Sequence, residues 1–171
     1  SFVYGTLTLG SGPTAGTVNW PLGGTNTLIV SSFSSSVAGS ILDMTNGGTL
    51  SLTSWTSANM TFTPGTGTIV YAGTTTMPSA ITTYNNLKIN IAAGTVTLGA
   101  VTTINSTLTL TAGTLDVSLS NFNITISGAW VNNCGTFTPG SGTVTFNSTT
   151  AAQNINGTAA SQTFNNITIN K

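Results

Sequence analysis

Charged side chains are almost absent from this sequence. Its 171 residues include Asp43, Lys88, Asp116 and Lys171, and no His, Arg or Glu. An ordinary soluble domain has about 25% charged residues, whereas this chain has 2%. General acid–base catalysis needs a titratable group beside the reacting bond, and Ser and Thr hydroxyls are weak nucleophiles without an adjacent base. The composition therefore predicts that the protein is not an enzyme and has no catalytic residues.

The same scarcity argues against several partners and cofactors. Nucleic-acid binding needs clustered Lys and Arg to neutralise phosphates, and a zinc site needs several Cys, His or carboxylate ligands. We therefore expect no nucleic-acid partner, no metal and no cofactor. No apolar run approaches the roughly 18 residues of a membrane helix, so we do not expect the chain to span a membrane. Cys134 has no second Cys to pair with, and we expect it to be buried as a small apolar residue.

Alternation of apolar residues with Thr, Ser or Asn is abundant. Clear examples are the segments 49–53, 107–111 and 143–146. A period of two is typical of a strand with one apolar face, and β-branched residues favour strands. Gly and Pro punctuate these runs at turn positions, and no segment has the apolar spacing of a helix. The sequence predicts an all-β protein, with looser, loop-rich structure at 10–26 and 31–48.

The chain contains an internal repeat. Residues 55–71 match residues 130–146, and residues 84–90 match residues 164–170. Self-similarity of this kind is the signature of repeat architectures, whose units bury their apolar faces by stacking on one another. The repeats predict the following organisation: a single all-β domain over 1–171, with a divergent or incomplete repeat at 1–54, a repeat at 55–129, and a repeat truncated at the chain end at 130–171.

Two motifs resemble the repeats of large microbial secreted surface proteins. They are Gly-Thr-Phe-Thr-Pro-Gly-Ser-Gly-Thr-Val-Thr-Phe-Asn at 135–147 and Phe-Asn-Asn-Ile-Thr-Ile at 164–169. The stretch 94–130 is similar to the β-helical portions of autotransporter-like and haemagglutinin-like adhesins. The resemblance covers 55–171 well and the first 50 residues poorly. It implies a parallel β-solenoid on a cell surface or in an extracellular fibre. The alternative fold is an antiparallel β-sandwich or jelly roll with an exchanged strand, because composition does not separate the two.

The second repeat stops before an element that the first repeat contains. Gly-Thr-Val-Thr-Leu-Gly at 94–99 has no counterpart after residue 170, whereas Gly-Thr-Leu-Thr-Leu-Gly stands at 5–10. Three explanations fit: subunits dock head to tail, the chain is a stretch of a longer tandem array, or the six-residue similarity arises by chance in a Thr-rich sequence. Uncapped strands pair readily with another chain, and a net charge of zero supplies no repulsion. We expect identical subunits to assemble into an extracellular filament, sheath or surface stalk. The predicted assembly residues are Phe2, Val3, Tyr4, Leu7, Leu9, Phe164, Ile167 and Ile169.

The alternative function is an adhesin segment that binds glycans or other surfaces. Trp20, Trp55 and Trp130 are candidate rings for stacking on sugars. The Thr-x-Thr runs also resemble the flat Thr arrays of ice-binding β-solenoids, which need the same face on successive coils, whereas here the runs are irregularly spaced. Candidate N-glycosylation sites occur about as often as the Asn, Ser and Thr content yields by chance: Asn59, Asn105, Asn123, Asn147, Asn156 and Asn166.

Overall fold

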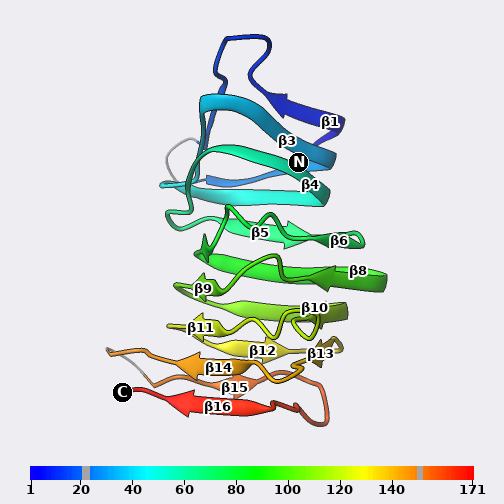
Figure 1. The fold of residues 1–171 in the computed structure, drawn as a ribbon, viewed down its shortest axis with the longest axis vertical. Coiled ribbons are helices and arrows are strands. Elements are labelled where there is room, and N and C mark those ends of the chain that lie inside the picture. Colours follow the sequence, from blue (N-terminus) through cyan, green and yellow to red (C-terminus); the bar gives the residue numbers. More distant parts are fainter. Residues whose placement is uncertain (21–23, 150–151) are drawn as a thin grey trace.

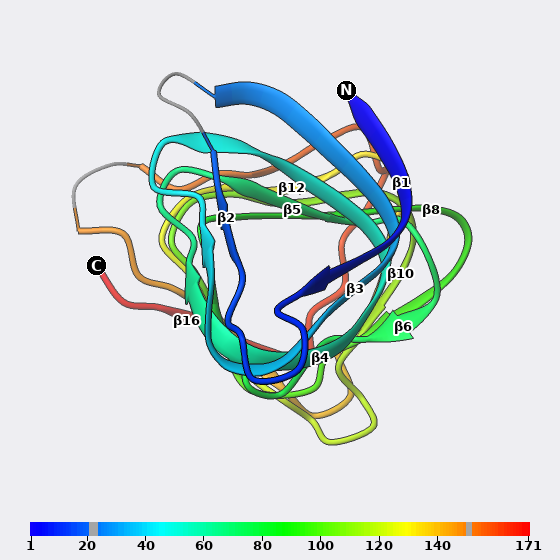
Figure 2. The ribbon, with the colours of Figure 1, turned by 90° about the horizontal axis from the view of Figure 1, so that it is seen from above.

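The chain folds as an all-β parallel solenoid of about seven turns. The computed structural model describes residues 1–20, 24–149 and 152–171. The coils stack along the long axis of the molecule from the N-terminal to the C-terminal end (Figure 1), and along that axis they surround a common interior (Figure 2). Within this described part, no helix is long and apolar enough to cross a membrane.

Sixteen strands in the described residues form two sheets. The larger sheet has eleven strands: β1 (Phe2–Leu9), β2 (Thr17–Asn19), β3 (Gly24–Asp43), β4 (Gly47–Thr63), β5 (Thr68–Tyr71), β6 (Thr75–Thr76), β8 (Asn86–Thr97), β10 (Leu108–Asp116), β12 (Trp130–Asn132), β13 (Thr136–Thr138) and β15 (Ile155–Asn156). The second sheet has five strands: β7 (Thr83–Tyr84), β9 (Thr102–Ile104), β11 (Ile124–Ile126), β14 (Thr143–Phe146) and β16 (Asn166–Ile169).

Every pairing between these strands is parallel. Strands in the middle of the stack, such as β5, β8 and β11, lie beside a strand of the coil before and a strand of the coil after, and a coil takes roughly 20 residues, as solenoid repeats do. Strands joined by hairpins would pair antiparallel. The sequence prediction of a solenoid is therefore confirmed, and the alternative of an antiparallel sandwich is wrong.

Inward-facing residues stack in columns that run through the coils. Within the second sheet Ile104, Ile126 and Phe146 are paired in register, and all three are buried. Burying a side chain of this size stabilises the fold by roughly 1.5–3 kcal/mol. Each coil therefore gains most of its stability by packing against the neighbouring coils. The longest column crosses the larger sheet: Leu28, Leu50, Ile69, Leu87, Leu108, Trp130 and Ile155.

The Ser-rich run at 31–36 lies inside a strand, so the expectation of a loop-rich segment at 31–48 is wrong. This run belongs to β3, which is 20 residues long and pairs with β1 on one side and β4 on the other. Parallel ladder bonds on both edges hold the backbone extended whatever the side chains are. The Ser35 hydroxyl is buried and bonds the carbonyl of Asn59 one coil away at 3.4 Å.

The sequence repeat does not coincide with the coil. Segment 68–71 lies in the larger sheet as β5, whereas its match at 143–146 forms β14 of the second sheet. Likewise, 86–90 lies in β8 of the larger sheet, and its match at 166–170 contains β16 of the second sheet. Because both sheets need the same apolar–polar alternation, similar segments fit either face.

Candidate functional site

The two aspartates each close a turn within their own segment. Asp43 Oδ1 accepts hydrogen bonds from the backbone N–H of Thr45 at 2.8 Å and from its hydroxyl at 2.6 Å. These bonds, the hydroxyl first, lower the pKa of Asp43. Asp116 Oδ1 accepts the backbone N–H of Ser118 at 2.7 Å. Among the described residues no three His, Cys, Asp or Glu side chains come together as a metal site. The geometry around both carboxylates is that of local turn closure.

A tyrosine pair is buried in the interior. The hydroxyls of Tyr71 and Tyr84 lie 3.3 Å apart and hydrogen-bond one another, and both side chains are fully buried. Burial raises the pKa of each phenol above its ordinary value, because the phenolate would lose its hydration. Two neutral phenols that satisfy one another form a structural contact across the interior, between β5 of the larger sheet and β7 of the second sheet.

The three tryptophans are buried. Trp55 meets Phe33 edge to face with centroids 5.0 Å apart, and Trp130 meets Phe137 in the same way at 4.8 Å. Trp20 lies at the N-terminal end of the interior beside Gly48, which has a φ of +85° and whose Cβ, if present, would overlap the indole. Stacking on a sugar needs a free ring face, which these positions do not present.

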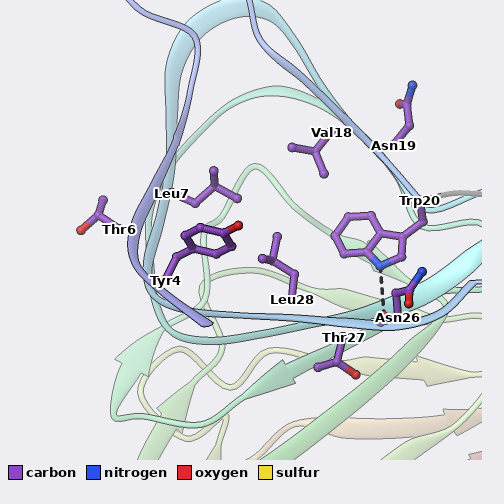
Figure 3. Close-up of a pocket in the computed structure, with 9 residues that line it drawn as sticks. All are labelled: Tyr4, Thr6, Leu7, Val18, Asn19, Trp20, Asn26, Thr27 and Leu28. Atoms are coloured by element: carbon purple, nitrogen blue, oxygen red, sulfur yellow. Dashed lines mark hydrogen bonds between the residues drawn. The ribbon is translucent and has the colours of Figure 1, made fainter. Parts of the chain in front are cut away.

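The N-terminal end of the solenoid is an open apolar hollow of about 490 Å³ (Figure 3). Trp20 forms one wall, with its Nε1 donating to the carbonyl of Asn26 at 3.2 Å. Beside the hollow, β1 presents Val3 (71% exposed) and Tyr4. Among the described strands β1 pairs only with β3, so its outer edge is a row of unpaired backbone groups. The other lining residues are Thr6, Leu7, Val18, Asn19, Thr27 and Leu28.

The C-terminal end presents isoleucines where the interior columns stop. Ile155 follows Trp130 in register, and Ile167 and Ile169 follow Val144 and Phe146. All three isoleucines are exposed, Ile169 by 59%. The polar residues that alternate with these isoleucines point outward. The isoleucines therefore lie where a further coil would cover them. Apolar surface left at the end of a column is free to be buried by another chain.

The structure separates the predicted assembly residues into two groups. Tyr4, Ile167 and Ile169 are exposed at the two ends, as an intermolecular contact requires, whereas Val3 is exposed on the outer side of the larger sheet in register with Ile29. Leu9 is buried, and Leu7 and Phe164 are partly buried against the core. The Phe164 ring packs 4.9 Å from Trp130 between centroids. The side chain of Phe2 is outside the part of the chain that the structure describes. Sequence reasoning missed Ile155, because the residues around it show no alternating run.

The candidate sequons lie on the outside of the coils. Asn147 is half-buried, and the others are exposed. Several of their amides bind the neighbouring coil: Asn59 Nδ2 donates to the Ser36 carbonyl at 3.2 Å, and Asn166 Nδ2 to that of Ser141 at 3.1 Å. These bonds give the Asn side chains a structural role. The five exposed sequons are Asn59, Asn105, Asn123, Asn156 and Asn166.

Cys134 is exposed, so the expectation of a buried thiol is wrong. It lies in the turn after β12, where Asn132 turns inward and its Oδ1 accepts the backbone N–H of Gly135 at 2.9 Å. The buried Asn132 side chain occupies the inward position at this corner, and the thiol two residues later faces solvent.

Comparison with known protein families, with curated proteins and with solved structures finds no match to this chain. The candidate site is therefore identified from the structure of this chain alone, and it consists of the two ends of the coil stack.

Proposed function

We propose that this is a non-enzymatic structural protein of the extracellular space or cell surface, whose subunits assemble head to tail into a filament, sheath or stalk. The observation that carries the proposal is the pair of open ends. At one end lies the apolar hollow beside the free edge of β1, and at the other the isoleucine columns end in solvent. The extracellular location rests on the resemblance of the repeats to secreted surface proteins.

The unlike ends favour a head-to-tail contact over a symmetric one. All strands run parallel from coil to coil, so a second copy placed along the axis continues the same ladder and the same columns. A two-fold contact would pair β1 with itself antiparallel and leave Ile155 and Ile169 uncovered. Burying each isoleucine contributes roughly 1.5–3 kcal/mol. A heterologous contact that does not close into a ring produces an open filament.

The scarcity of charge removes the usual obstacle to such a contact. Charged side chains at sheet edges are a common protection against strand pairing between molecules. At the described ends Lys171 is the one charged side chain, and the strands β1, β15 and β16 carry none. An added charge at either end should therefore disrupt assembly.

The test places a lysine at one end at a time. Tyr4→Lys, at a residue that lines the N-terminal hollow, or Ile169→Lys at the C-terminal end should prevent filament growth, because each buries a charge in the contact. Leu119→Lys is the matched control, since Leu119 is 82% exposed but lies between β10 and β11, away from both ends. Sedimentation velocity and electron microscopy measure the size of the assemblies.

Mixing the two blocked variants distinguishes the head-to-tail contact from a symmetric one. Tyr4→Lys keeps an intact C-terminal end and Ile169→Lys an intact N-terminal end, so the mixture should form one-to-one dimers that grow no further. Dimers in Ile169→Lys alone would instead show a symmetric N-terminal contact. A wild-type chain that stays monomeric at high concentration would refute the proposed assembly.

A further inference from the structure

Five threonines stand in one straight column on the outside of the second sheet. Thr103 pairs with Thr83 and Thr125, and Thr145 pairs with Thr125 and Thr168, each in register across neighbouring coils. Their strand neighbours Ile124 and Ile126 are buried, so the threonines face solvent. The Thr-x-Thr runs look irregular along the sequence because the turns between the coils differ in length. In space they form one row, with neighbours about 4.8 Å apart.

A second polar column runs beside the first. Its residues directly follow the strands, and each donates its backbone N–H to the preceding coil: Asn105 to Tyr84, Ser127 to Ile104, Asn147 to Ile126 and Asn170 to Phe146. Asn147 Oδ1 and the Ser127 hydroxyl are hydrogen-bonded at 3.0 Å. The two columns together are here called the threonine face. It contains no charged side chain and no aromatic ring.

The threonine face is held rigid by bonds between the coils. Beyond the backbone ladder, Asn123 Oδ1 accepts the N–H of Thr143 at 2.8 Å, and Asn166 Nδ2 donates to the Ser141 carbonyl at 3.1 Å. β-Branched threonines on a strand also have few rotamers. The hydroxyls and methyls therefore keep their spacing without a further loss of conformational entropy on binding.

We propose that the threonine face is a binding surface for ice. Hydroxyls repeating at the strand spacing can hold water molecules at the same repeat, which is close to the spacing of water oxygens on ice planes. The methyl groups between them offer no competing hydrogen bonds, so the held waters keep one arrangement. A lattice of neutral water molecules needs a regular, uncharged and rigid surface, and those are the properties of this face.

Other partners fit the threonine face less well. Crystalline polysaccharides are bound through exposed aromatic rings that stack on sugars, and this face has none. Anionic surfaces and membranes need basic side chains, whereas the nearest strand-borne cation, Lys88, lies in β8 of the other sheet. The larger sheet also differs in character, because Lys88 stands in register between Val70 and Thr109 on its outer side.

The test compares one substitution on each sheet. Thr125→Lys puts a long charged side chain in the middle of the threonine column and should abolish inhibition of ice recrystallisation. Thr109→Lys is the matched control, because Thr109 is equally half-buried, faces outward and lies in β10 of the larger sheet. The control should retain the wild-type activity. Ice recrystallisation and thermal hysteresis are measured on the full chain, with circular dichroism to verify folding.

A second site on the same column makes the result independent of one variant. Thr103→Lys should lose activity as Thr125→Lys does, and the proposal stands if both fold and both fail. The proposal is overturned if the wild-type chain leaves ice growth unchanged, if Thr125→Lys and Thr109→Lys behave alike, or if the chain pellets with microcrystalline cellulose and not with ice. Assembly is proposed at the ends of the stack and ice binding on its side, so Tyr4→Lys, in β1 of the larger sheet, should remain active on ice.

Discussion

At the residue scale, one oxygen of Gln162 satisfies two buried donors. Its Oε1 accepts the indole N–H of Trp130 at 3.0 Å and Nδ2 of Asn132 at 2.6 Å. Both partners are buried, and a buried donor without a partner costs about 1–3 kcal/mol. The sequence gives no sign of this contact, because Gln162 is 32 residues from Trp130 along the chain and belongs to no repeat motif.

Replacing Gln162 by leucine should lower the free energy of unfolding by about 1–3 kcal/mol, since both donors lose their acceptor. Gln162→Glu keeps an acceptor oxygen and should cost less. Urea unfolding followed by circular dichroism measures the difference, and a red shift of Trp fluorescence should accompany the leucine variant. Equal stability of the leucine variant and the wild type would show that the two donors find other acceptors.

At the element scale, alternation predicted the strands but not their arrangement. Segments such as 107–111 and 143–146 lie largely or wholly in strands as expected, because an alternation with period two indicates which residues face inward. Parallel and antiparallel pairing require the same period, so the fold could be chosen only through the resemblance of the repeats. The segment 31–36 was missed because its Ser content is typical of loops, while ladder bonds on both sides keep it in β3.

The predicted assembly residues stay a prediction, and the structure adds residues that the sequence did not indicate. Ile169 was predicted because it stands in an alternating run, and it is exposed where the column of Phe146 ends. Ile155 and the threonine column depend on the register between coils, and that register depends on the length of every turn. A single sequence does not show how these turn lengths place the strands in space, so both features required the structure.

Position in the stack should decide the cost of losing an isoleucine. Ile126 in β11 has a coil on either side and is fully buried, whereas Ile169 in the edge strand β16 is exposed. Ile126→Ala should reduce the free energy of unfolding by about 2–5 kcal/mol. In a monomeric preparation Ile169→Ala should change it by less than about 0.5 kcal/mol.

Denaturant unfolding at low protein concentration measures both variants. At assembling concentrations Ile169→Ala should acquire a cost, because the contact between subunits then buries this residue. A large effect of Ile169→Ala in the monomer would mean that the C-terminal coil already covers it.

At the scale of the whole molecule, few groups titrate, so stability should hardly change over the neutral range. Asp43 has a lowered pKa in the folded state, so its contribution is present above its ordinary value of 3.8 and is lost only as the pH falls below that. Screening by salt acts on charges, and the chain has four charged side chains. Neither folding nor assembly should respond to 1 M salt.

The alkaline limit should come from the buried tyrosine pair. Tyr71 and Tyr84 have raised pKa values when folded, whereas in the unfolded chain they ionise near 10. Above about pH 10 the folded state therefore holds more protons than the unfolded state, and stability falls as the pH rises, by about 1.4 kcal/mol per pH unit for each tyrosine. Urea midpoints between pH 5 and 11 should be flat and then decline steeply. The double variant Tyr71→Phe, Tyr84→Phe should lose most of that decline; an unchanged decline would place the alkaline sensitivity elsewhere, since the phenols would then not be the groups that ionise on unfolding.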